Sequence, residues 1–144
     1  GGTKATFELT QDEETLNFLR TKAETAAWIT SVCTGALVLG AAGLLKGYKA
    51  TTHWAAKEAL SAYGAEITEG RYVIDRNRAT GGGVTAGIDF GLAMIAEISG
   101  EQLAQVAQLA MEYSPKPPFQ SGTPEEASTE TKKMVLAGFA ESSR

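Results

Sequence analysis

Two hydrophobic patterns alternate along the 144-residue chain. Short runs of apolar and β-branched residues predict buried strands, and longer segments with apolar residues three or four positions apart predict helices. The expected strands are residues 28–32, 49–52, about 67, 71–75 and 78–80. The expected helices are one that follows Thr10, then about 36–45, 53–63, 88–98, 101–112 and a last one from Thr123. This alternation is typical of an α/β fold with a mostly parallel sheet.

Several boundaries are marked by residues with a local structural role. Thr10 and Glu13 have the spacing of a capping box at a helix start, and Gly64 stands where a helix would end. Arg76-Asn77 is expected in a turn between two strands. The run Thr123-Pro124-Glu125-Glu126 predicts an N-cap, a proline in the first turn and acidic residues after it, and therefore the start of the last helix.

The number of predicted strands is small for a complete α/β domain. A parallel sheet must be covered by helices on both faces, and the chain supplies two or three parallel strands and a small hairpin. We therefore expect residues 1–144 to be the C-terminal portion of a single domain of more than ~200 residues. The first strands of that domain are expected on an upstream segment.

The single cysteine stands where a predicted strand meets a predicted helix. The segment Ser31-Val32-Cys33-Thr34-Gly35 has the spacing of a nucleophile elbow, in which small residues two positions before and after the nucleophile allow a sharp turn. Such a turn places the side chain at the carboxyl edge of the sheet, where α/β folds bind ligands. The following helix favours a thiolate, and the Thr34 N–H is expected to stabilise an oxyanion. Alternatively, Cys33 is a buried small hydrophobic residue.

Composition and charge narrow the classes of function. One Cys and one His exclude a disulfide framework and a structural zinc site. A net charge of −4 with scattered basic residues does not favour nucleic-acid binding. No apolar run reaches the roughly 20 residues of a membrane span, so no membrane partner is expected. The free thiol favours a reducing, cytoplasmic location.

Several motifs together resemble the ThiJ/PfpI superfamily, whose fold is class I glutamine-amidotransferase-like. They are the elbow with Ala36, residues 41–45 (Ala-Ala-Gly-Leu-Leu) and residues 50–54 (Ala-Thr-Thr-His-Trp). Residues 80–90 and 112–119 are similar to the isocyanide hydratase branch of this superfamily. The resemblance covers nearly the whole chain. It implies a flavodoxin-like three-layer sandwich with a mostly parallel sheet.

The resemblance also implies an activity that needs no cofactor and no metal. Enzymes of this branch hydrate an isocyanide to an N-substituted formamide and act as homodimers. Cys33 would attack the terminal isocyanide carbon, and water would release the formamide from the resulting thioimidate. Thr34 follows the nucleophile, and Gly2 matches a family turn whose backbone amide faces the thiolate.

The acidic residue that moves the proton in the family has no match in this chain. In the family it follows the first strand of the domain, which precedes the matched segments. Asp12, Glu13 and Glu14 are expected on a surface helix and are therefore no substitutes. We expect the acid on the upstream segment, as part of the same domain.

The glycine-rich segment at residues 81–86 formally fits a dinucleotide motif, but no strand ending in an acidic residue follows it. The resemblance implies instead that Gly82 and Gly83 let the backbone pass close to the cysteine, with Val84 as a wall of the substrate pocket. His53 is expected at the same edge of the sheet, and it is predicted to line the substrate pocket together with Gly82, Gly83 and Val84. Its role stays open between a Cys–His pair, a structural residue and a contact in the dimer.

Two other functions remain open. Domains with a similar cysteine turn and a Thr-Thr-His-Trp segment form the ligand-sensing half of AraC-type transcription regulators. In those proteins a basic DNA-binding domain of about 100 residues follows the sensor, whereas this chain has a net charge of −4. Another hydrolase or glyoxalase activity of the same superfamily is the third interpretation, and it differs only in the substrate.

Overall fold

The computed structural model describes residues 1–142. Helices and strands alternate in it from residue 13 to residue 67. In chain order they are α1 (Lys4–Leu9), α2 (Glu13–Ala23), β1 (Ile29–Val32), α3 (Gly35–Ala41), β2 (Lys49–Ala50), the 3-10 helix η1 (Trp54–Ala56), α4 (Lys57–Ala62), β3 (Glu66–Ile67), β4 (Tyr72–Asp75), β5 (Arg78–Gly81), α5 (Ala86–Ser99), α6 (Glu101–Ala110) and α7 (Thr129–Ser142).

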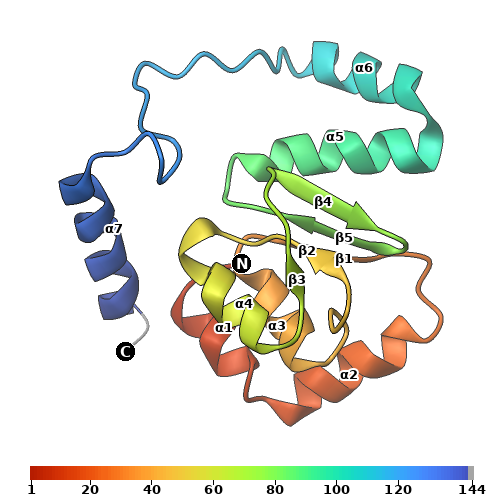
Figure 1. The fold of residues 1–144 in the computed structure, drawn as a ribbon. Helices are drawn as coiled ribbons and strands as arrows, with labels where there is room; N and C mark the ends of the chain where they lie inside the picture. Colours follow the sequence, from red (N-terminus) through yellow and green to blue (C-terminus); the bar gives the residue numbers. More distant parts are fainter. Residues whose placement is uncertain (143–144) are drawn as a thin grey trace.

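The strands form a three-stranded sheet of order β1-β5-β4 and a two-stranded sheet of β2 and β3. The pairs β1–β5 and β2–β3 are parallel, and β4–β5 is an antiparallel hairpin. Figure 1 shows α1 to α4 on one face of the three-stranded sheet and α5 on the other. The expectation of a three-layer α/β arrangement with mostly parallel pairing is therefore confirmed.

The register of the parallel pair places the cysteine beside the glycine-rich segment. Ile29 lies opposite Arg78, and Val32 lies opposite Gly81. Because parallel strands end at the same edge of a sheet, Cys33 and Gly82 leave it side by side. Among the described residues, β1 has a strand partner along one edge only.

The core lies between the sheet and α3. Leu37, Leu45 and Leu60 are fully buried, and each contributes about 1.5–3 kcal/mol of transfer free energy. A buried hydrogen bond joins the two sheets, because the Thr51 N–H donates to Thr80 Oγ1 over 2.8 Å. This core fixes the carboxyl ends of β1 and β5 relative to α3.

Three predicted boundaries are wrong. The cap of α2 is Asp12, whose carboxylate accepts from the Thr15 N–H, and not Thr10, which ends the unpredicted helix α1. The helix from about residue 36 ends at Ala41 rather than residue 45. The Thr123 hydroxyl caps only a turn, and α7 begins after Ser128, whose hydroxyl accepts from the Thr131 N–H.

The C-terminal third of the described chain exposes many apolar side chains. They include Ile88 and Ile98 of α5, Leu103, Val106 and Leu109 of α6, Phe119 of the extended loop, and Met134, Val135 and Leu136 of α7. No helix within residues 1–142 combines the length and the apolar character needed to cross a membrane.

Candidate active site

The backbone at Cys33 turns sharply between β1 and α3. Its φ of 59° lies in the left-handed region, which costs a residue with a side chain about 1–3 kcal/mol. The turn is fixed by hydrogen bonds on both backbone groups of Cys33. Its N–H donates to the carbonyls of Gly81 (3.0 Å) and Gly82 (2.7 Å), and its carbonyl accepts from Thr52 Oγ1 (2.8 Å). This is the strained geometry that the elbow motif predicts.

The first two residues pack directly against this turn. A Cβ on Gly1 would lie 2.7 Å from Cys33 Cβ and 3.0 Å from the Thr34 nitrogen, so only glycine fits there. The Gly2 N–H donates to Thr34 Oγ1 over 2.9 Å, and the same hydroxyl donates to the Gly2 carbonyl. The structure therefore brings Gly2, Cys33 and Thr34 together, and the Gly2 N–H is directed at the Thr34 hydroxyl.

Two polar groups beside the elbow have no partner within residues 1–142. The Thr34 N–H donates to no described acceptor, which leaves it available as an oxyanion donor. Ser31 Oγ is buried and also makes no hydrogen bond there. Because buried hydroxyls in proteins are nearly always paired, Ser31 marks a place where a further polar group fits.

Gly82 connects the elbow to the opposite wall of the site. Its carbonyl accepts from the Cys33 N–H, and its own N–H donates to the Arg71 carbonyl over 2.8 Å. A Cβ on Gly82 would lie 3.4 Å from the Arg71 oxygen and 3.5 Å from Ala86 Cβ. The backbone therefore passes close to the cysteine, as expected for this segment.

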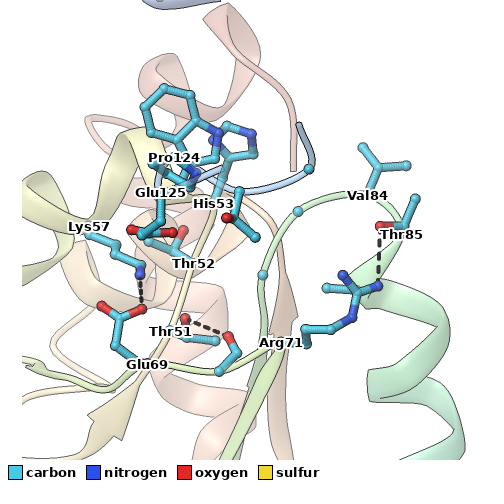
Figure 2. A pocket seen from close by; sticks show the side chains of 17 residues that line it. Thr51, Thr52, His53, Lys57, Glu69, Arg71, Val84, Thr85, Pro124 and Glu125 are labelled. Carbon is cyan, nitrogen blue, oxygen red and sulfur yellow. Dashed lines mark hydrogen bonds and ion pairs between the residues drawn. The ribbon is translucent and has the colours of Figure 1, made fainter. Parts of the chain in front are cut away.

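A cavity of about 510 Å³ lies next to this wall (Figure 2). His53, Gly82, Gly83 and Val84, the four residues predicted at the substrate pocket, all line it, and Val84 is 84% exposed at its rim. Its remaining lining is largely polar and includes Thr51, Thr52, Lys57, Glu69, Arg71 and Glu125. Cys33 does not line it. The elbow and the cavity are instead adjacent, joined by the Cys33–Gly82 and Thr52–Cys33 hydrogen bonds.

His53 is held as a structural residue on the cavity side. Its Nδ1 accepts from the Ala55 N–H over 3.3 Å and so caps η1. Its ring stacks on Phe139 of α7 with 4.8 Å between centroids. Burial lowers the pKa of His53 below its ordinary value, because the charged form loses hydration. The ring is therefore neutral at neutral pH.

Sequence reasoning missed three parts of this site. Thr52 positions the Cys33 carbonyl, Arg71 holds the Gly82 amide, and Phe139 covers His53. Thr52 adjoins His53 in a segment that was singled out, but Arg71 and Phe139 carry no local signal. Residues 1–142 contain no group of three or more His, Cys, Asp or Glu side chains placed to hold a metal ion.

A strained cysteine between a parallel strand and a helix, faced by a glycine-rich wall, defines a class of α/β proteins. The chain belongs to the DJ-1/PfpI family, whose model matches residues 1–97. Isonitrile hydratase from Pseudomonas putida is 55% identical over 119 residues, which are 83% of this chain and 52% of that protein. A ThiJ/PfpI family protein from Pseudomonas syringae superposes with a TM-score of 0.93 and 50% identity, over 99% of this chain and 59% of that one.

A regulator is also similar to part of the chain. The HTH-type transcriptional regulator CdhR of Pseudomonas aeruginosa is 38% identical over 91 residues, which are 62% of this chain and 27% of the regulator. The chain thus spans about half the length of the hydratase and about a quarter of the regulator.

Proposed function

We propose that the protein is an isocyanide hydratase with Cys33 as the nucleophile. The observation that carries this proposal is the elbow: Cys33 is held at a φ of 59° by hydrogen bonds to both of its backbone groups. The 55% identity with a protein named isonitrile hydratase, isonitrile being another word for isocyanide, supports the choice of substrate. A neutral, capped His53 supports a mechanism without a Cys–His pair.

The reaction needs one molecule of water and no redox partner. The Cys33 thiolate forms a C–S bond to the terminal isocyanide carbon, and a proton adds to the same carbon to give a thioimidate. Water then adds to that carbon while the nitrogen takes a proton. Finally the hydroxyl of the adduct loses its proton, which replaces the one used in the first step, the C–S bond breaks, and the formamide leaves with the thiolate restored. We propose that the Thr34 N–H, which has no acceptor among residues 1–142, donates to the oxygen of the water adduct.

The proton donor of this reaction is proposed to lie on a segment upstream of residue 1, in the same domain. The chain spans 52% of the Pseudomonas putida hydratase. One edge of β1 is unpaired within the described residues, and Ser31 Oγ is buried without a partner. Both features fit an added strand and a polar group beside the elbow. Asp12, the N-cap of α2, and Glu13, in its first turn, are both exposed.

Homodimer formation and a cytoplasmic location are part of the same proposal. The apolar side chains exposed on α5 and α6 are a surface that a second subunit would cover. The cysteine is free and partly exposed, and unpaired thiols are kept reduced in the cytosol.

The test is an assay of formamide formation from an aryl isocyanide by the full-length protein. Cys33→Ala is expected to lower kcat/KM by at least about a thousandfold, because the covalent route is lost. The matched control is Thr30→Ala on the same strand, whose side chain is exposed. Absence of formamide with the unaltered protein would remove the proposed activity, and a fully active Cys33→Ala variant would remove the mechanism.

A ligand-sensing role is the second candidate. It is favoured by the similarity to CdhR and by a cavity that is not lined by the cysteine. A sensor would bind its ligand equally well with Cys33→Ala, and it would release it chemically unchanged. Mass analysis of the ligand after incubation therefore separates the two candidates.

A further inference from the structure

The wall segment, residues 82–85, has few anchors of its own. Two of its residues are glycines, and Val84 is almost fully exposed. Thr85 stands at the N-cap of α5, but its hydroxyl makes no capping hydrogen bond to that helix. Other groups must therefore hold this segment in place.

Arg71 holds the wall segment at both ends. Its carbonyl accepts from the Gly82 N–H over 2.8 Å, and its Nη2 donates to Thr85 Oγ1 over 3.2 Å (Figure 2). Its Nε donates to Asp89 in the first turn of α5. The other carboxylate oxygen of Asp89 accepts from Tyr113 OH over 2.9 Å. Asp89 is thus shared between Arg71 and the segment that follows α6.

The position of this wall is directly coupled to the nucleophile. The Cys33 N–H donates to the Gly82 carbonyl. A Cβ on Gly87, at the start of α5, would lie 3.2 Å from Val32 Cγ1, so α5 touches the residue before the cysteine. A shift of the wall segment therefore either moves Val32 and Cys33 with it or breaks the hydrogen bond from the Cys33 N–H to the Gly82 carbonyl.

We propose that Arg71, Asp89 and Tyr113 form a clamp that positions the wall segment against Cys33 and thereby sets which sizes of isocyanide are accepted. The inference rests on the proposed function. The three side chains act as positioning residues: they hold the backbone between Gly82 and Thr85, and the wall contacts the substrate. The guanidinium is needed for its planar fork, because it reaches Thr85 and Asp89 at the same time.

The experiment compares four variants of the full-length protein, using a small alkyl isocyanide and a bulky aryl isocyanide. Arg71→Met is expected to change the ratio of the two kcat/KM values about tenfold, because the pocket wall is no longer fixed. Arg71→Lys keeps the positive charge but lacks the planar guanidinium, so its ratio should lie between those of Arg71→Met and the unaltered protein. Tyr113→Phe leaves Arg71 charged and should shift the ratio in the same direction, by about two- to threefold. Arg76→Met is the matched control.

Arg76 pairs with Asp75 at the far end of the same hairpin and does not line the cavity. Its replacement should leave the ratio unchanged. Full recovery by Arg71→Lys, with no effect of Tyr113→Phe, would overturn the clamp and assign Arg71 a direct charge contact. An unchanged ratio in Arg71→Met would also overturn it.

A second measurement keeps the clamp testable if the proposed hydration itself fails. The rate of Cys33 alkylation by iodoacetamide reports the elbow without any isocyanide. The clamp predicts an altered rate in Arg71→Met and an unaltered rate in Arg76→Met, at similar melting temperatures. Equal rates in both variants would refute the clamp, whereas absence of formamide with the unaltered protein would refute only the proposed activity.

Discussion

The two sides of the site are held in different ways. On the elbow side, residues 31–35 are fixed by backbone hydrogen bonds and by the close approach of Gly1 and Gly2. On the wall side, residues 82–85 are fixed by the side chains of Arg71, Asp89 and Tyr113. The elbow is held by main-chain hydrogen bonds and by the short, buried hydroxyls of Thr34 and Thr52. The wall depends on long side chains that reach it from other elements.

This difference has an energetic consequence. The elbow keeps Cys33 in a conformation that costs about 1–3 kcal/mol, and buried hydrogen bonds offset that cost. The ion pair of the wall is partly exposed, with 55% of the Arg71 side chain accessible, and such pairs contribute about 0–1 kcal/mol each. A substitution at the elbow should therefore lower stability and activity together, and one at the wall should mainly change activity.

Apart from removal of the cysteine itself, the largest effect is expected from Thr34→Val. Thr34 is 1% exposed, and its hydroxyl bonds both the N–H and the carbonyl of Gly2. Valine removes the hydroxyl that pairs with both Gly2 backbone groups, and the loss of each such hydrogen bond costs about 0.5–1.5 kcal/mol. We expect a lower free energy of unfolding in urea and a fall of about tenfold in kcat/KM. Thr34→Ser keeps the hydroxyl and serves as the control. Equal stability of the two variants would contradict the account of the elbow.

A smaller effect, confined to activity, is expected from Gly82→Thr. An added Cβ at residue 82 fits in ordinary van der Waals contact. The γ atoms of threonine would extend beyond it into a space bounded by the Arg71 and Thr52 carbonyls. Overpacking of this kind costs about 1–3 kcal/mol, and a wall that can move relieves it by shifting. We expect about a fivefold fall in kcat/KM, with Gly82→Ala close to the unaltered protein.

Gly91→Thr is the control for Gly82→Thr. Gly91 lies in α5, and within residues 1–142 no atom outside the neighbouring helix backbone lies within 4 Å of an added Cβ, so the same side chain finds open space there. Melting temperatures and steady-state kinetics are measured for Gly82→Thr, Gly82→Ala and Gly91→Thr, to show whether the loss of activity is specific to threonine at residue 82. If Gly82→Thr unfolds like Thr34→Val, the two sides of the site do not differ as described.

The difference between the sides also explains what the sequence could predict. The elbow was predictable because its requirements are local: small residues flank Cys33 at fixed spacing, between an apolar run and a helix. The glycines of the wall were visible for the same reason. The clamp was not, because Arg71 and Asp89 are 18 residues apart and Tyr113 lies 24 beyond Asp89. The packing of α5 on the hairpin brings Arg71 to Asp89, and the packing of α6 on α5 brings Tyr113 there.

The wrong helix starts have a related cause. Thr10 and Thr123 each have acidic residues at the spacing that a cap requires, and Asp12 and Ser128 offer equivalent oxygens a few residues later. Local chemistry allows either choice. The segment before each helix decides which residue caps it. Thr10 is already the C-cap of α1, and the loop before α7 continues as far as Ser128. The overall fold was less sensitive to these shifts, because strand order depends on apolar runs rather than on caps.

The smallest effect is expected for His53→Asn, in the pH dependence of the free energy of unfolding. This variant tests whether protonation of His53, on the wall side, destabilises the protein. Burial lowers the pKa of His53, so below its ordinary value of about 6.5 the unfolded chain binds the proton more tightly. Stability is therefore undiminished above about pH 6.5 and is lost as the pH falls toward the lowered pKa. Asparagine accepts from the Ala55 N–H without titrating. Urea unfolding between about pH 7.5 and 5.5 should show a weaker loss in the variant. Parallel pH profiles for both proteins would mean that His53 exchanges protons as freely as in the unfolded chain, and that the cavity wall does not exclude water from it.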